Sequence, residues 1–336
     1  MTGSMTGSMT GSMTSGITIW APDGAPEISD SDDLAAVLVG LLGDDGLLDG
    51  DIVAVTSKVV AKAEGRVRAG DKDAAVDDET VRVVARRGAT TIVRTRHGLT
   101  MAAAGVDASN VASGHVVLLP TDPDASASAV RRRLHELTGR VVGVLVTDTA
   151  GRAWREGQSD IAIGAAGIRV IEDFSGRADP HGNLLVVTAP AVADEIAGAV
   201  ELAQGKLGRR PFAVVRGRAD LVLPAGDDGT GAAALVRAEG ADMFGLGSRE
   251  AVVRALVGDP DDVDLYGRPA PAEELAAVLR ELPGVESAPR EDTVRVTTAD
   301  ARAAWAAGVA AYAHGWEPVP GAPDGVVDLR PSRPLT

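Results

Sequence analysis

Two side chains with oxygen ligands, Asp148 and Thr149, directly follow an apolar, β-branched run at 141–147. Such a run predicts a buried strand, and ligands of α/β proteins bind beyond the carboxyl ends of strands. Carboxylate and hydroxyl oxygens at a rigid strand end suit a hard cation such as Mg²⁺ or Mn²⁺. An Asp or Thr is equally expected there as the N-cap of a helix. Both interpretations stay open on these residues alone.

A second carboxylate, Asp107, follows a run of very small residues at 101–106 and precedes Asn110 by three positions. Small side chains let a backbone approach a ligand closely. Asp107 and Asn110 could therefore provide a metal ligand and a polar contact to a nucleotide. An ordinary Asx turn explains the same residues equally well.

Lysine is rare in this chain, since only four of the 33 basic residues are Lys. Two of them, Lys58 and Lys62, lie just after Ser57 and the apolar run 51–56. This pairing favours a point-charge role toward phosphate over simple solvation. The segment 151–158 adds Arg152, Arg155 and Gln158 close behind Asp148, a composition that suits phosphate or carboxylate recognition better than a plain surface loop.

Short β-branched runs alternate with helical stretches from Ile17 to about Gly247, which predicts a mixed α/β (α+β) domain. Helix 126–138 should place Val130, Leu134 and Leu137 on one face and end at Gly139. Helix 190–204 should begin from Thr188 and Pro190, place Val192, Ile196 and Val200 on one side, and end at Gly205. The strands that position the polar residues are predicted at 51–56, 90–95, 115–119, 141–147, 184–188 and 212–216.

Three further segments complete the organisation. Residues 1–16 repeat Met-Thr-Gly-Ser and predict a disordered tail that is not a signal peptide. Residues 17–247 form the main domain. Residues 248–336 are richer in Pro and acidic residues and predict a small α/β appendage, with helices at 249–257, 272–282 and 299–313 and a strand at 293–297, followed by a disordered Pro-rich tail.

Composition excludes several classes of protein. The formal charge is −15 and aromatics are 3%, so nucleic acid is a poor partner. The chain has no Cys, which leaves oxygen or imidazole ligands for any metal. No apolar run approaches the roughly 20 residues of a membrane span, which predicts a cytoplasmic enzyme or binding protein. Motifs for P-loop nucleotide hydrolases, zincins and α/β-hydrolases are absent.

Longer blocks of sequence carry a resemblance to a known family. They are TSKVVAKAEG (56–65), GLTMAAAGVDASNV (98–111), LLPTDPDASA (118–127), VTDTAGRAWREGQSDIAIGAAGI (146–168), DPHGN (179–183) and VVTAPAVADEIAGAVELAQGK (186–206). In collinear order from about residue 17 to 247, they resemble the coenzyme F-420-0:L-glutamate ligases, also called F-420 gamma-glutamyl ligases. Blocks of this length are far more specific than a short motif.

The resemblance implies a GTP-dependent ligase of coenzyme F-420 biosynthesis. GTP would phosphorylate the terminal carboxylate of F-420-0, and the amine of L-glutamate would attack the acyl phosphate, with release of GDP and phosphate. Later rounds would add γ-linked glutamates. The implied fold is specific to this family and forms an intertwined homodimer. The implied ions are two divalent cations, Mg²⁺ or Mn²⁺, with K⁺ as a further ion.

The family's site residues map onto this sequence one by one. Asp107 and Asp148 match shared metal ligands, and Thr149 matches a ligand of a second divalent ion. Ser57, Lys62 and Asn110 match nucleotide contacts. The turn Ala25-Pro26-Glu27-Ile28 takes the place of an N-terminal nucleotide-binding turn.

The chain departs from the bifunctional actinobacterial form of the family. There a flavin-binding, nitroreductase-like domain follows the ligase domain, whereas 248–336 do not resemble it. We therefore expect no flavin and no reductase activity, and the role of 248–336 stays open. A non-catalytic carrier of F-420 or nucleotide is the alternative to the ligase, and a ligase for another phosphorylated lactate-like acid is a third hypothesis.

Overall fold

The computed structural model describes residues 16–238, 242, 246–267, 269–321, 323 and 325–332. The chain folds into two compact units, 1–237 and 238–336. The division predicted after Gly247 lies further along the chain, within the second unit. The tail predicted at 1–16 lies outside the described residues except for Gly16. No helix in the described part of the chain is both long and apolar enough to cross a bilayer.

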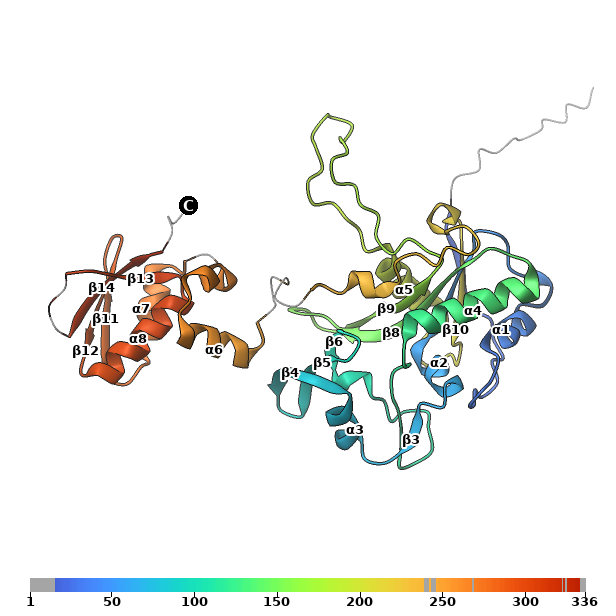
Figure 1. The fold of residues 1–336 in the computed structure, drawn as a ribbon, viewed down its shortest axis with the longest axis horizontal. Helices are drawn as coiled ribbons and strands as arrows, with labels where there is room; N and C mark the ends of the chain where they lie inside the picture. The colour runs from blue at the N-terminus through green and yellow to red at the C-terminus, as the bar shows by residue number, and fades with distance from the viewer. Residues whose placement is uncertain are drawn as a thin grey trace, which may run out of the picture. The chain divides into compact units, whose positions relative to one another are not determined.

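A five-stranded sheet with the order β1-β10-β2-β8-β9 forms the centre of the first unit (Figure 1). Only β2 and β8 are parallel, and the other neighbours are antiparallel. The mixed α/β class predicted from the sequence is confirmed. The strands are β1 (Thr18–Trp20), β2 (Ile52–Thr56), β8 (Gly143–Gly151), β9 (Gln158–Ala166) and β10 (Phe212–Arg216).

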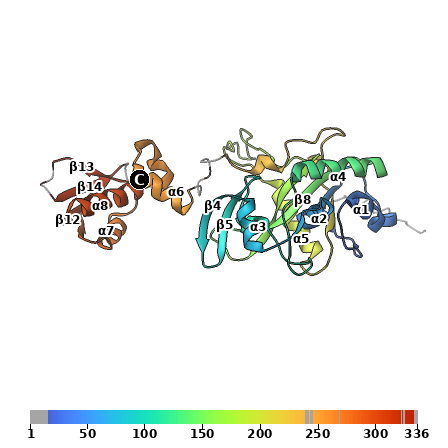
Figure 2. The same ribbon diagram turned by 60° about the horizontal axis from the view of Figure 1, so that its bottom comes forward.

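Helices cover both faces of this sheet, as Figures 1 and 2 show. Val53 and Val55 of β2 belong to a core with α1, α2 and α4, while Ile52 and Ala54 belong to a core with α5. A strand covered on both faces is apolar throughout, which explains why the run at 51–56 shows no alternation. These helices are α1 (Leu34–Leu42), α2 (Ser57–Ala63), α4 (Pro123–Thr138) and α5 (Val192–Gln204).

Two smaller sheets and one helix extend the first unit beside β8. They share an apolar cluster that includes Ala75, Val93, Ala104 and Val116. The three-stranded sheet has the order β4-β5-β6, and the two-stranded sheet pairs β3 with β7. The elements are β3 (Val67–Ala69), α3 (Lys72–Glu79), β4 (Thr80–Arg87), β5 (Thr90–Thr95), β6 (Thr100–Ala102) and β7 (His115–Val117).

The helix boundaries correct two predictions. Helix α4 begins at Pro123, three residues before the predicted start, because Asp122 caps it and proline suits the first turn. Leu134 is buried, but Leu137 is 40% exposed. Helix α5 begins at Val192 after Ala191, because the backbone at Thr188 and Pro190 accepts hydrogen bonds from Phe174 and Glu172 instead. Val192, Ile196 and Val200 lie on its buried side, which agrees with the prediction that they share one side.

The strand predicted at 184–188 is wrong. The segment 169–191, all of it described, is a long projecting arm (Figure 1), and its one bridge joins Ala178 to Leu184. Its backbone bonds are mostly to itself, such as Phe174 N to Thr188 O at 2.9 Å. Leu184, Val186 and Val187 are 68%, 76% and 88% exposed. Strong β-propensity without a sheet face to pack on did not produce a strand.

The second unit is a four-stranded antiparallel sheet with the order β11-β12-β14-β13, packed against α7 and α8. The disordered Pro-rich tail is a wrong prediction, because β13 and β14 complete this sheet. Pro318 lies on edge strand β13 and Pro331 ends β14, where proline is tolerated. The elements are α6 (Ser248–Val257), a 3-10 helix (Pro260–Tyr266), α7 (Ala272–Arg280), β11 (Val285–Pro289), β12 (Val294–Thr298), α8 (Ala301–Ala313), β13 (Trp316–Val319) and β14 (Val326–Pro331).

Candidate active site

The parallel pair β2 and β8 brings the first two polar residues together. Thr56 and Thr147 are partners in register, and Ser57 and Asp148 each follow by one residue. The Ser57 hydroxyl donates to Asp148 Oδ1 at 3.1 Å. The two residues come from segments 91 positions apart, so the contact depends on the sheet and not on local sequence.

Asp148 is half-buried, and its carboxyl has a raised pKa. Burial raises the pKa of its carboxyl to about 6, against the hydrogen bonds from Ser57 and the Thr149 backbone. The charges of Asp160 and Asp107 raise the pKa further. Three carboxylates therefore act on one another here, and such a set is stabilised by a cation.

Asp107 lies beside the first turn of α2. Lys58 Nζ lies 2.5 Å from Asp107 Oδ2, and Ser109 donates from both its backbone nitrogen and its hydroxyl to the same carboxylate. Although burial alone would raise the pKa of Asp107, these bonds hold it below its ordinary value. Ala103, Ala104 and Asn110 all have positive φ (50°, 53° and 56°), a costly conformation for non-glycine residues that often occurs at functional sites.

Lys62, one turn further along α2, joins the other predicted nucleotide contacts. Its ammonium contacts the Glu27 carboxylate and donates to the Asn110 carbonyl at 2.9 Å. The Lys62 side chain is only 10% exposed. The turn 25–28, α2 and the loop 107–110 therefore meet at one buried ammonium.

Thr149 faces the opposite side of the sheet from Asp148, because side chains alternate along β8. Its hydroxyl donates to Asp160 Oδ1 at 2.7 Å and accepts from Lys206 Nζ at 2.6 Å. Asp160 is 4% exposed, and Lys206 follows the end of α5. Burial, with the charge of Asp160, raises the pKa of nearby Glu201.

The structure thus brings the predicted residues into two neighbouring groups at one end of β8. One contains Glu27, Ser57, Lys62, Asp107, Asn110 and Asp148, and the other contains Thr149. Arg152 and Arg155 are on the exposed β8–β9 turn, where Arg152 donates to the Glu156 carbonyl at 2.6 Å. Neither arginine, nor Gln158, has a side-chain bond to these groups among the described residues.

Three residues of the groups were missed by the site prediction: Ser109, Asp160 and Lys206. A signal existed for two of them. Lys206 is one of only four lysines, and Asp160 is a lone charge at the start of an apolar run. Lys58, singled out with Lys62 for a role toward phosphate, contacts Asp107 in this structure. Three of the four lysines are therefore in or beside the candidate site.

The donor set suits a hard divalent ion in its chemistry, since it consists of carboxylate and hydroxyl oxygens. In the described part of the chain, however, no three acidic or His side chains form a ready metal cluster. Lys58 provides the positive charge beside Asp107. An ion at Asp107 would require this ammonium to turn away, toward a bound anion for example.

Comparison with known proteins shows which family the chain is similar to. The family model described as F420-0:Gamma-glutamyl ligase matches residues 24–77 and 73–217. The chain is 37% identical over 220 residues to the coenzyme F420:L-glutamate ligase of Archaeoglobus fulgidus, covering 59% of this chain and 87% of the relative. Proteins of the same name from Methanothermobacter thermautotrophicus and Methanopyrus kandleri are 37% and 38% identical over 219 and 218 residues, covering 58% and 59% of this chain and 86% of each relative.

Proposed function

The chain belongs to the F420-0:gamma-glutamyl ligase family, and we propose that it is a GTP-dependent coenzyme F-420-0:L-glutamate ligase of coenzyme F-420 biosynthesis. One observation supports this most directly. Four segments distant in sequence, the turn 25–28, α2, the loop 107–110 and the end of β8, meet at two lysines and three carboxylates. Ammonium groups that neutralise phosphate charge and carboxylates that can hold metal ions are the groups a phosphoryl-transfer site needs.

The proposed chemistry has two steps. A carboxylate oxygen of F-420-0 attacks the γ-phosphorus of GTP, which forms an acyl phosphate and releases GDP. The amine of L-glutamate then attacks the acyl carbon, the amide forms, phosphate leaves, and the amine proton passes to solvent. Repetition on the γ-carboxylate of the added glutamate would lengthen the chain.

The nucleotide is proposed to bind along α2. Lys58 and Lys62 are four positions apart, so both ammonium groups are on one side of the helix. Ser57, Asn110 and the turn Ala25–Ile28 border the same side through their contacts. Phosphoryl transfer needs positioning and charge neutralisation more than covalent help, and these groups can provide both.

Asp107, Asp148 and Thr149 are proposed to hold two divalent ions, Mg²⁺ or Mn²⁺, with K⁺ as a further ion. Such ions neutralise phosphate charge and orient the transferred group. Because Asp148 and Thr149 face opposite sides of β8, they suit two separate ions better than one shared ion.

A homodimer is proposed from the projecting arm 169–191. Exposed Leu184, Val186 and Val187 present apolar surface that a monomer leaves in water. Exposed apolar surface of this kind commonly marks a protein contact. A second copy of the chain is the natural partner for this arm.

The test is a reaction of purified protein with F-420-0, GTP, L-glutamate and Mn²⁺ or Mg²⁺. Mass spectrometry should show added glutamyl units, matched one to one by released GDP. Asp148→Asn should reduce turnover at least a hundredfold, while Glu291→Gln, an exposed carboxylate in the second unit, should leave it unchanged. Unmodified F-420-0 after complete incubation would refute the ligase and favour the carrier hypothesis.

A further inference from the structure

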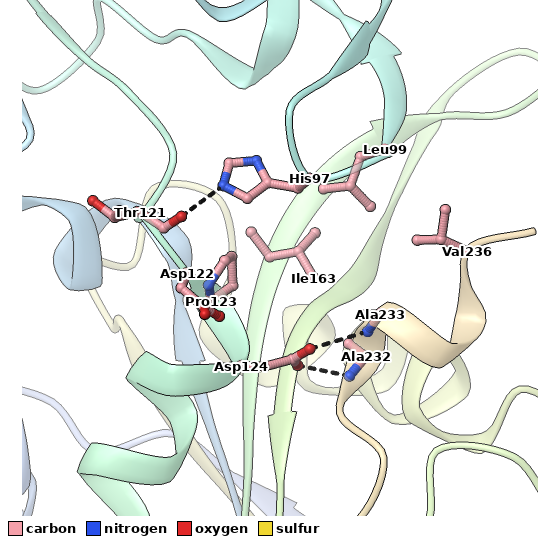
Figure 3. A pocket seen from close by; sticks show the side chains of 10 residues that line it. All are labelled: His97, Leu99, Thr121, Asp122, Pro123, Asp124, Ile163, Ala232, Ala233 and Val236. Atoms are coloured by element: carbon pink, nitrogen blue, oxygen red, sulfur yellow. Dashed lines mark hydrogen bonds between the residues drawn. The ribbon is translucent and has the colours of Figure 1, made fainter. Parts of the chain in front are cut away.

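A cavity of about 230 Å³ opens at the start of α4. Figure 3 shows its lining, which comes from the β5–β6 connection, the first turn of α4, β9 and the segment after β10. Leu99, Ile163 and Val236 provide apolar walls. The other lining residues are His97, Thr121, Asp122, Pro123, Asp124, Ala232 and Ala233.

The cavity lies on the same side of the central sheet as Asp148. Ile163 is the extra residue of a β-bulge, because Val146 pairs with Gly164 while Thr147 pairs with Ala162. Ile161, the partner of Asp148, and Ile163 both pack in the core that contains Val146. Ile163 in the cavity wall is therefore two residues along β9 from Ile161, the cross-strand partner of Asp148, on one face of the sheet.

A cation with no counter-ion among the described residues lies beside one end of the cavity, outside the residues that line it. Arg94 is half-buried, and its guanidinium makes no hydrogen bond or ion pair with any residue of the chain that is described. A Cβ placed on Gly98 would lie 3.7 Å from Arg94 Nη2 and 3.3 Å from Val236 Cγ1, so the guanidinium is next to the Val236 wall. Arg94 is also directly opposite Arg82 in the β4–β5 register. Like charges in that position are destabilising. Arg82 has an interaction of its own, so Arg94 is the member of the pair whose charge a bound anion would offset.

An anionic oxygen is available at the other end. Asp124 is already engaged by three backbone nitrogens, those of Ala165, Ala232 and Ala233, the last two drawn in Figure 3. Asp122 Oδ1 accepts from Ala125 N at 3.0 Å to cap α4. Among the described residues Asp122 Oδ2 has no donor, so it can accept from a ligand cation. His97 closes this end through its Nε2 contact to the Thr121 carbonyl at 3.1 Å.

From one end of the cavity to the other, a ligand would meet the cation beside it, the apolar walls and then a carboxylate. The cavity volume is smaller than the roughly 300–1,000 Å³ of pockets that bind drug-sized ligands. A nucleotide or a deazaflavin is too large for it. A small zwitterion with an extra carboxylate matches its size and its charges.

We propose that this cavity is the binding subsite for the amino acid substrate, in which Arg94 binds the side-chain carboxylate of L-glutamate and Asp122 binds its ammonium group. This assignment rests on the proposed ligase function. It accounts for selection of an acidic amino acid, because glutamine would leave the half-buried guanidinium of Arg94 without its anion.

Two substitutions test the subsite by steady-state kinetics with glutamate and glutamine as competing acceptors. Arg94→Gln should raise KM for glutamate tenfold or more and abolish the preference for glutamate over glutamine, while KM for GTP changes less than twofold. Asp122→Asn keeps a good helix cap, so it should raise KM for both amino acids and preserve the preference. Arg86→Gln, an exposed arginine on the same hairpin, should behave as wild type.

A wild-type preference for glutamate in Arg94→Gln would overturn the proposal, as would an equal rise of KM for GTP. If Arg94→Gln fails to fold by circular dichroism, Asp122→Asn decides, and an unchanged KM overturns the proposal. If the wild-type protein makes no product at all, the ligase function fails separately. Calorimetric titration with L-glutamate then decides, because the subsite requires binding that is lost in Arg94→Gln.

Discussion

Replacing Asp148 with Asn should stabilise the metal-free protein while removing its activity. The pKa of Asp148 rises from 3.8 to about 6 in the folded protein, and each unit corresponds to about 1.4 kcal/mol. Ionisation of this carboxyl therefore costs up to about 3 kcal/mol more in the folded state than in the unfolded chain. The amide of the substituted asparagine would keep the contact with Ser57 and carry no charge.

The gain should depend on pH in a defined direction. Below pH 3.8 the carboxyl is protonated in both states, so the wild type carries no penalty. As the pH rises toward 6, the unfolded chain ionises first and wild-type stability falls. Above pH 6 the penalty is complete. Asp148→Asn should thus be close to wild type at pH 4 and about 3 kcal/mol more stable at pH 7.5.

Urea unfolding in EDTA at a series of pH values between 4 and 8 measures this difference. The exposed carboxylate variant Glu291→Gln provides the control and should give no pH-dependent difference. A difference between Asp148→Asn and wild type that does not change with pH would refute the argument, because the carboxyl would then titrate alike in both states. Addition of Mn²⁺ at pH 7.5 should narrow the gap by stabilising the wild type alone.

Three further predictions concern the nucleotide contact, packing and the two units. Lys62→Gln should raise KM for GTP tenfold or more, because hydrogen bonds of charged groups contribute about 1.5–3 kcal/mol. Lys72→Gln, outside the site, should leave KM for GTP unchanged. Initial rates at varied GTP concentrations measure both KM values. Gly164→Ala should lower the free energy of unfolding by about 1–3 kcal/mol, because its Cβ would lie 2.2 Å from the Pro123 carbonyl oxygen. Gly40→Ala in α1, with open space around it, should instead stabilise by about 0.5–1 kcal/mol in the same urea titration. A fragment ending at Arg237 should unfold in one cooperative transition, because the first unit has its own apolar clusters. A broad, uncooperative transition would contradict this.

Local signals were sufficient for the elements that carry their own pattern. The β-branched run 212–216 forms β10, and the helix predicted at 299–313 forms α8 with the same last residue, since such elements depend mainly on neighbouring residues. The arm 169–191 shows the converse. Its apolar residues 184–187 have the composition of a strand, and they bond to residues 176–178 of the same arm, but the pairing stops at one isolated bridge because these side chains have no sheet face to pack on.

Contacts between distant segments could not be predicted from spacing. The pairing of Ser57 with Asp148 follows from the parallel register of β2 and β8, and Lys62 meets Glu27 only because the turn 25–28 folds back across α2. The resemblance to relatives supplied these residues, while the structure supplied their partners. Asp160 escaped notice because its role depends on the bulge in β9, and a β-bulge leaves no periodic trace in a short strand.

The use of lysine links the sequence to the site. In a chain where arginine serves nearly every structural ion pair, such as Arg216 with Asp51 and Arg131 with Asp228, lysine is retained at positions 58, 62 and 206 beside the site carboxylates. An ammonium is a compact charge on a flexible stem, able to leave a carboxylate when a phosphate or a metal ion arrives, whereas a bidentate guanidinium is held in place by its geometry. Arginine at position 58 should therefore hold Asp107 in a fixed pair and compete with a cation, which predicts that Lys58→Arg weakens metal binding more than Lys58→Ala does.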